Sequence, residues 1–303
     1  MQQALAAIVA RFSIHEIDFF PSYPLSRLTT LRIGGPCTLL AVPKSEEVLL
    51  SLLSLLDEQG IPRVLLGNGS NILAPDEGYR GVVIRTSALR DLSVREGEIR
   101  AACGVPLFSL VQAANAEGVA GLSRLAGIPG TVGGALFMNA GAFSACMGDT
   151  VKTVRVVPAN GGTPFTLTRR ECDFSYRKSI FQARTLLILS ALFSGEAAAP
   201  HLLTEESRQI MERRRAKQPL ELPNAGSTFR RPAEGFAGRL IEESGLCGVS
   251  VGGATVSRKH AGFIVNTGGA TAKDVRTLIS MIQNEVYERT GIRLVREIEY
   301  LGE

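Results

Sequence analysis

The sequence has little of what a disulfide framework or a metal centre requires. Its five cysteines form no C-x-x-C pair and are spread over positions 37, 103, 146, 172 and 247. An odd number of widely separated cysteines argues against a disulfide framework and a structural zinc site. The three histidines also stand far apart and form no H-E-x-x-H pattern. We therefore expect no bound metal.

Long apolar runs and blocks of like charge are missing as well. The most apolar stretches, 48–56 and 186–193, are far shorter than the roughly 20 residues of a membrane helix. The first twelve residues lack a basic segment followed by a cleavage site. The net charge of +4 is dispersed, whereas nucleic-acid binding usually needs a basic stripe. A slight positive excess suits an anionic small ligand, but a mildly basic surface explains it as well. We expect a reduced cytoplasmic protein without a membrane or nucleic-acid partner.

What remains is a regular alternation of strand-like and helix-like segments, which predicts an α/β or α+β fold. Ser45 is expected to N-cap a helix that runs through Glu58, with Gly60 as its stop. Residues 194–201 are expected to be a linker. The other predicted helices are 4–12, 107–117, 204–217, 235–243 and 274–289. The predicted strands are 39–43, 62–67, 81–85, 99–103, 151–157, 163–168, 185–193, 262–266 and 294–300.

Two glycine-rich segments are the first candidates for a binding site. In the first, LLGNGSNIL at 65–73, Gly67 and Gly69 allow backbone N–H groups to converge, and Ser70 and Asn71 add donors, which suits a diphosphate. The segment is neither a P-loop nor a dinucleotide fingerprint, because the required lysine and the third glycine are missing. A tight turn after a strand explains these residues equally well.

The second segment has glycines at 127, 130, 133, 134 and 141 within an apolar stretch. Ordering so many glycines costs chain entropy, which indicates that the backbone approaches something closely. A flat cofactor ring or a pyrophosphate would explain this composition. Close packing of a helix on a sheet is the alternative.

Five motifs together resemble one enzyme family. They are LGNGSNIL, GIPGTVGGALFMNAGAF, YRKS, KQPLELPNAGSTFRRP and KHAGFIVN, and the resemblance extends over residues 25–302. The family is UDP-N-acetylenolpyruvoylglucosamine reductase, and the sequence is similar to its second, shorter type. The resemblance implies an α+β fold with an FAD-binding region of the vanillyl-alcohol-oxidase type. Its two subdomains are expected at 1–75 and 76–200, followed by a C-terminal α+β substrate domain at 201–303.

The resemblance also implies the ligands and their contacts. It implies a monomeric oxidoreductase of peptidoglycan precursor synthesis that uses FAD and NADPH to reduce UDP-N-acetylglucosamine enolpyruvate to UDP-N-acetylmuramate. Tyr176, Lys217 and Lys259 are the expected substrate contacts. The expected cofactor contacts are Arg32, Gly67, Asn68, Gly69, Ser70, Asn71, Gly127, Ile128, Gly130, Thr131, Gly133, Gly134 and Arg214. Cations at the end of a helix also complement its dipole, so Arg214 and Lys217 have a structural explanation too.

Three residues are the catalytic candidates that the resemblance implies. Arg177, in YRKS, is permanently charged and able to hold a carboxylate with two hydrogen bonds. Ser227, in NAGS, is the expected proton donor, although an Asx-type turn would explain the same residues. Glu297, in the closing strand, is expected to stabilise the enolate or assist the proton relay. Alternation places Glu299 on the same face, so Glu299 is the alternative to Glu297.

Two other functions stay open at this point. An FAD-dependent oxidase or dehydrogenase of another alcohol or sugar would need no such catalytic set and would consume O₂. A non-catalytic nucleotide-sugar binding protein would bind UDP ligands without turnover. The flavin spectrum of the purified protein, followed without oxygen on adding NADPH and then the enolpyruvyl substrate, separates both from the reductase.

Overall fold

The contacts of the chain divide it into two units with separate hydrophobic cores. The computed structural model describes all 303 residues. Unit 1 comprises Met1–Pro21, Leu39–Asn68 and Gly81–Glu212, and unit 2 comprises Ser22–Thr38, Gly69–Arg80 and Arg213–Glu303. Each unit has its own cluster of buried apolar side chains. The predicted three-part division at residues 75 and 200 stays a prediction.

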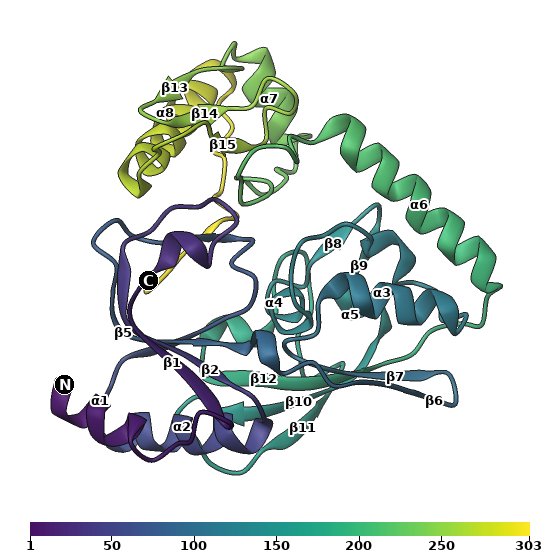
Figure 1. The fold of residues 1–303 in the computed structure, drawn as a ribbon. Helices are drawn as coiled ribbons and strands as arrows, with labels where there is room; N and C mark the ends of the chain where they lie inside the picture. Colours follow the sequence, from purple (N-terminus) through teal and green to yellow (C-terminus); the bar gives the residue numbers. More distant parts are fainter. The chain divides into compact units, whose positions relative to one another are not determined.

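Unit 1 is built on an antiparallel sheet with the strand order β11-β10-β12-β7-β6 (Figure 1). Its strands are β6 (Leu92–Arg95), β7 (Glu98–Ala102), β10 (Val151–Pro158), β11 (Phe165–Thr168) and β12 (Leu186–Phe193). A second sheet has the order β1-β2-β5-β3, in which β3 and β5 are parallel. Its strands are β1 (Ile17–Pro24), β2 (Pro36–Pro43), β3 (Arg63–Leu66) and β5 (Tyr79–Arg85). The predicted strands of residues 39–193 are therefore confirmed.

Among the helices of unit 1, α2 (Glu46–Glu58) begins where its capping residue predicts. The Ser45 side chain accepts a hydrogen bond from the Val48 N–H at 3.3 Å, and α2 buries four leucines beneath it. The other helices are α1 (Gln2–Val9), α3 (Leu107–Ala116), α4 (Val132–Phe137), α5 (Met147–Thr150) and the larger part of α6 (Pro200–Lys217). Short segments complete the unit: β8 (Gly141–Ala142), β9 (Ala145–Cys146), and the 3-10 turns Thr86–Ala88, Ser123–Leu125 and Ile180–Ala183. The predicted start of α6 at Thr204 was wrong, because Pro200 opens the helix at a position that tolerates its missing N–H.

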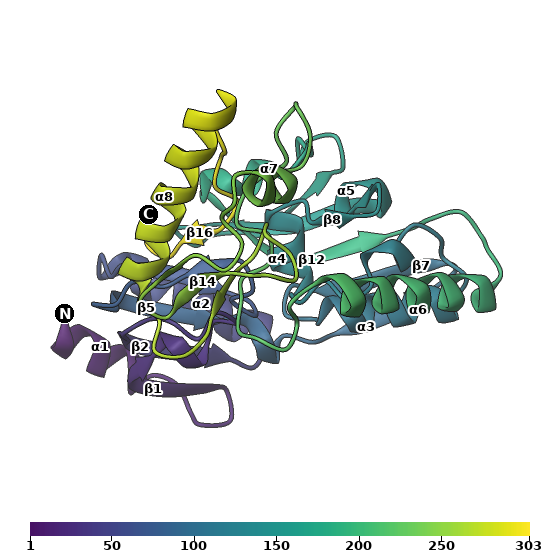
Figure 2. The same cartoon turned by 90° about the horizontal axis from the view of Figure 1, so that it is seen from above.

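Unit 2 contains a small antiparallel sheet and two helices. The sheet has the order β13-β14-β15 and consists of β13 (Ser250–Val251), β14 (Ala254–Val256) and β15 (Ile264–Asn266). The helices are α7 (Ala237–Glu243) and α8 (Ala272–Thr290), the long helix drawn in yellow in Figure 2. Two strands, β4 (Ile72–Leu73) and β16 (Glu299–Tyr300), pair in parallel, and Leu25–Arg27 forms a 3-10 turn.

Both ends of α8 are fixed by hydrogen bonds. Thr271 and Asp274 form a capping box, and the Asp76 carboxylate accepts from the N–H groups of Ala272 and Lys273 at 2.7 and 3.1 Å. The helix ends at Gly291, which adopts a left-handed conformation with φ 72°. The sequence predicted this helix within two residues at its start and one residue at its end.

The closing strand was predicted too long. Only Glu299–Tyr300 forms a strand, whereas 294–298 makes a single bridge between Phe229 and Arg296. The alternation was real in terms of burial, since Leu294 is buried and Val295 is 57% exposed. This alternation did not produce a strand, because the segment forms only two main-chain hydrogen bonds with the facing chain around Phe229.

Two further findings concern the whole chain. No helix is long and apolar enough to cross a membrane. No group of three or more His, Cys, Asp or Glu side chains is placed to hold a metal ion.

Candidate active site

The two glycine-rich segments touch each other in unit 1. A Cβ atom added to Gly67 would lie 2.4 Å from the Oγ1 atom of Thr131, which is closer than real atoms approach. Thr131 is buried and N-caps α4, with its Oγ1 accepting from the Gly134 N–H at 3.4 Å. The turn after β3 therefore lies directly against the start of α4, and the absent side chain at position 67 is what permits this.

Packing explains one glycine of the second segment but not its neighbour. A Cβ on Gly133 would lie 2.9 Å from the Cβ of Cys103, and the Gly133 N–H donates to the Cys103 carbonyl at 2.8 Å. Close packing on the sheet thus requires Gly133. A Cβ on Gly134 would meet nothing nearer than the Thr131 Oγ1 at 3.6 Å, and Gly134 is exposed. The packing alternative therefore leaves Gly134 unexplained.

Arg177 occupies a strained position in a tight turn of unit 1. Ser175 and Lys178 exchange two main-chain hydrogen bonds across the turn at 3.0 and 3.1 Å, and Arg177 has a φ of 53°. For a residue with a side chain this left-handed conformation costs roughly 1–2 kcal/mol. Its Nη2 donates to the Gly141 carbonyl at 3.0 Å, and its guanidinium lies 5.2 Å from the Tyr176 ring centre. Strained residues of this kind concentrate at functional sites.

Two buried side chains hold this turn against the second glycine-rich segment. The Asn139 Nδ2 donates to the Ser175 carbonyl at 2.8 Å, while its Oδ1 accepts from the Gly148 N–H at 2.9 Å. The Ser179 hydroxyl donates to the Phe137 carbonyl at 2.7 Å. The conformation of the YRKS turn is therefore set by the residues that follow α4.

Ser227 lies exposed in a short loop of unit 2. Gly226, directly before it, has a φ of 75°, and its N–H donates to the Asn224 Oδ1 at 3.0 Å. Directly after it, the Thr228 N–H donates to the Gly262 carbonyl at 2.8 Å. The main chain is thus fixed on both sides of the serine.

Glu297 lies on the segment next to Ser227. Its N–H donates to the Thr228 carbonyl at 2.8 Å, and its own carbonyl accepts from the Asn71 Nδ2 at 3.1 Å. The Glu299 N–H in turn donates to the main-chain carbonyl of Asn71 at 2.9 Å. Unit 2 therefore brings two of the three predicted catalytic residues onto adjacent chain segments. Arg177 belongs to unit 1.

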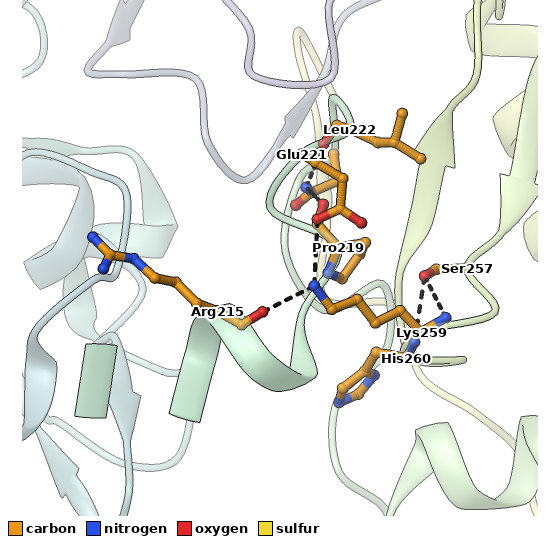
Figure 3. A network of polar contacts seen from close by, with 8 residues as sticks. Arg215, Pro219, Glu221, Leu222, Ser257, Lys259 and His260 are labelled. Atoms are coloured by element: carbon orange, nitrogen blue, oxygen red, sulfur yellow. Dashed lines mark hydrogen bonds and ion pairs between the residues drawn. The ribbon is translucent and has the colours of Figure 1, made fainter. Parts of the chain in front are cut away.

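The last turn of α6 carries two of the other predicted cations, Arg214 and Lys217. The Nε atom of Arg214 is buried without a hydrogen-bond partner, and burial lowers the pKa of this guanidinium below its usual range. The ammonium of Lys259 donates to the carbonyl of Arg215 at 2.9 Å and lies 3.4 Å from the Glu221 carboxylate (Figure 3). Lys259 therefore caps the end of α6, which the sequence did not indicate.

The comparisons with known proteins cover nearly the whole chain. A family model described as FAD binding domain matches residues 37–165, and one described as the C-terminal domain of UDP-N-acetylenolpyruvoylglucosamine reductase matches residues 218–301. The chain is 44% identical over 290 residues to a UDP-N-acetylenolpyruvoylglucosamine reductase from Caldanaerobacter subterraneus, with 96% of both proteins covered. It is 41% identical to one from Caldicellulosiruptor bescii, covering 95% of this chain and 92% of that protein.

The chain belongs to the UDP-N-acetylenolpyruvoylglucosamine reductase family.

A solved structure supports the family membership. The UDP-N-acetylenolpyruvylglucosamine reductase of Thermus caldophilus superposes with a TM-score of 0.80 at 32% identity, covering 94% of this chain and 98% of that one. The α+β class, with an FAD-binding domain and a C-terminal domain of this reductase family, is confirmed.

The residues present fit FAD. Both glycine-rich loops fall within the segment matched by the FAD-binding model. There Gly134 leaves main chain exposed, with no side chain packed on it. In unit 2, the buried Nε of Arg214 is a donor without an acceptor. Such a donor costs free energy unless a ligand satisfies it. Gly67, Asn68, Gly127, Ile128, Gly130, Thr131, Gly133 and Gly134 lie in unit 1, whereas Arg32, Gly69, Ser70, Asn71 and Arg214 lie in unit 2.

Sequence reasoning missed Asn139, and of the contacts of Asn224 it anticipated only the Asx-type turn, which the bond from the Gly226 N–H to the Asn224 Oδ1 confirms. Asn139 and Asn224 each begin an Asn-Ala-Gly triplet, and each bonds main-chain groups of a loop that carries a predicted catalytic residue. The repeated triplet was a usable signal. The long-range partners, such as the Ser175 carbonyl for Asn139, were not visible in it.

Proposed function

We propose that this protein uses FAD and NADPH to reduce UDP-N-acetylglucosamine enolpyruvate to UDP-N-acetylmuramate, a cytoplasmic step of peptidoglycan precursor synthesis. The names and near full-length coverage of its relatives support the substrate class. The observation that carries the chemistry is the hydrogen bond from the Glu297 N–H to the Thr228 carbonyl, because it places the segments of Glu297 and Ser227 side by side. We further propose that the protein acts as a monomer.

When bound, FAD would supply the redox chemistry, which is hydride transfer through N5 from NADPH to the methylene carbon of the substrate. The two glycine-rich loops and Arg214 are the residues that would hold this cofactor. The protein's own task is to stabilise the negative charge that then builds on the substrate and to protonate the carbon that bears the carboxylate.

Arg177 stabilises that charge. Its guanidinium is permanently cationic and offers two parallel donors to a carboxylate. The left-handed turn and the bond to the Gly141 carbonyl restrict where the guanidinium points. A preorganised donor of this kind needs no rearrangement as the enolate forms. Tyr176, which is exposed beside it, contacts the substrate.

Ser227 donates the proton. A serine hydroxyl is a weak acid, so the proton it gives up has to be replaced quickly. Exposure of Ser227 allows solvent to reprotonate it. Glu297, half-buried on the adjacent segment, stabilises the enol or assists this relay. Lys217 and Lys259 contact the UDP-sugar. The Lys259 ammonium has three N–H donors, and within the protein it contacts two groups, the Arg215 carbonyl and the Glu221 carboxylate.

Ser227→Ala tests the assignment by separating the two half-reactions. Stopped-flow absorbance at the flavin band follows bleaching by NADPH and the return of the band on adding the enolpyruvyl substrate under anaerobic conditions. General acid catalysis contributes about 10²- to 10⁴-fold, so we expect reoxidation to slow by this factor while bleaching is unchanged. Ser280→Ala, an exposed serine on α8, is the matched control. A normal reoxidation rate in Ser227→Ala would rule out the proton-donor role.

A further inference from the structure

The loop that carries Ser227 is built around one side chain, that of Asn224. Its Nδ2 donates to the carbonyls of Pro219 and Leu222 at 3.1 and 2.8 Å, and its Oδ1 accepts from the Gly226 N–H at 3.0 Å. All of these groups lie within one short stretch of unit 2. Asn224 therefore closes the loop on itself, and its amide uses both donor and acceptor sides to do so.

The main chain of Asn224 is held in place by a separate set of hydrogen bonds. Its carbonyl accepts from the Thr30 hydroxyl at 2.6 Å, and the residue forms an isolated bridge with Val265. The neighbouring Pro223 carbonyl accepts from the Asn266 N–H at 2.9 Å. The asparagine thus connects a fixed part of unit 2 to Gly226, one position before Ser227.

Lys259 makes a second set of contacts, which hold the start of the same loop. Its ammonium joins the end of α6 at Arg215 to Glu221, three positions before Asn224 (Figure 3). Ser257 accepts from the N–H groups of Lys259 and His260 at 3.2 and 3.3 Å, which fixes the segment that bears this lysine. The loop is therefore held at its beginning by Lys259 and at its end by Asn224.

We infer that Asn224 is a positioning residue for proton transfer, acting through Ser227. This inference rests on the proposed function, in which the Ser227 hydroxyl is the proton donor. With φ at 75°, Gly226 sits in a region from which it can readily move, since glycine adopts many backbone conformations. The bond from its N–H to Asn224 removes that freedom. Displacement of a reacting group by about 1 Å can cost roughly 100-fold in rate, so the loop conformation matters for the chemistry.

Two substitutions at Asn224 dissect this role. Asn224→Ala removes all three side-chain hydrogen bonds, and we expect reoxidation by the enolpyruvyl substrate to slow about 10- to 100-fold while bleaching by NADPH stays within about twofold of the parent. Asn224→Asp keeps an acceptor for Gly226 but turns a carboxylate toward the carbonyls of Pro219 and Leu222. Protonation of that carboxyl restores one donor, so the reoxidation rate of Asn224→Asp relative to the parent should rise as the pH falls.

Controls separate positioning from a general loss of stability. Asn115→Ala removes a buried amide on α3 that bonds the Ser207 hydroxyl at 2.8 Å, far along the chain from Ser227. We expect it to lower the melting temperature without changing the ratio of the two half-reaction rates. FAD content, read from the absorbance ratio, and the melting temperature of each Asn224 variant are measured alongside.

A double-mutant cycle decides whether Asn224 acts through Ser227. If it does, Asn224→Ala in the Ser227→Ala background adds less than about twofold to the loss, because the hydroxyl it positions is already gone. Full additivity, or a normal reoxidation rate in Asn224→Ala, overturns the inference while the proposed function stands. A normal rate in Ser227→Ala alone overturns both, and the two failures are thus distinguished.

Discussion

Gly67→Ala tests the contact between the two glycine-rich loops. The added Cβ would lie 2.4 Å from the Thr131 Oγ1 and 3.4 Å from the Cβ and Cγ2 of the same residue. Gly67 does not have a positive φ, so the backbone itself accommodates alanine. Thr131 is 2% exposed and caps α4, so it has little room to withdraw. The clash is therefore the whole effect of the substitution.

The expected magnitude follows from the cost of overpacking. Forcing an extra carbon into a filled site costs about 1–3 kcal/mol. If FAD needs both loops in their present positions, the same free energy appears in binding, which corresponds to a roughly 5- to 150-fold larger dissociation constant. Thr131→Ala removes the clashing hydroxyl at the cost of a helix cap, about 1 kcal/mol. In that background Gly67→Ala should therefore cost less than about 1 kcal/mol.

The assay is FAD titration of apoprotein followed by flavin fluorescence, together with thermal unfolding. Gly97→Ala is the control: its φ is 75°, and an added Cβ would meet no atom within 4 Å. It should lower the melting temperature through backbone strain and leave FAD affinity unchanged. If Gly67→Ala binds FAD as tightly as the parent, or loses the same affinity in the Thr131→Ala background, the loops do not act together.

Two further predictions concern Lys259 and His260. Lys259→Met should lower the melting temperature by about 1–3 °C at low salt and less at high salt, because a cation at a helix end contributes about 0.3–1 kcal/mol; an unchanged melting temperature would contradict the capping role. Burial, with a smaller contribution from the charge of Lys217, holds the pKa of His260 below its ordinary value of 6.5, although a main-chain hydrogen bond and the charge of Glu242 oppose this shift. The neutral ring accepts the Gly262 N–H at 3.1 Å. The folded state thus binds a proton at His260 less readily than the unfolded state does. The contribution of His260 to the free energy of unfolding is therefore complete above pH 6.5 and is lost as the pH falls below it. The acid-side slope of the melting temperature should be smaller in His260→Gln than in the parent.

Local signals were sufficient for most elements of the fold. Ser45 with its acidic first turn predicted α2, and Gly291 predicted the end of α8, because caps are set by neighbouring residues. The closing segment was different. Its alternation reflects burial at Leu294 and Ile298, but a strand also needs a partner, and the partner around Phe229 is distant in the sequence.

The candidate site was also predicted only in part, because local motifs identify residues but not their partners from distant parts of the sequence. Arg177, Ser227 and Glu297 were identified through motifs, and the structure shows that the segments of Ser227 and Glu297 are adjacent. The roles of these residues stay predictions. The Asx-type turn at Asn224 was anticipated and is confirmed. The bonds of the Asn224 Nδ2 and the capping of α6 by Lys259 were missed, because both depend on hydrogen bonds whose geometry exists only after the loop has folded. Periodicity and propensity carry no information about such contacts.

The most direct test of the proposed function is an anaerobic absorbance titration of the purified holoprotein. The account predicts a flavin band that bleaches on adding NADPH and returns on adding UDP-N-acetylglucosamine enolpyruvate, with UDP-N-acetylmuramate formed in equal amount. A band that bleaches but returns only with oxygen would instead indicate an oxidase. A preparation that shows no flavin band even after FAD is added would contradict the central claim.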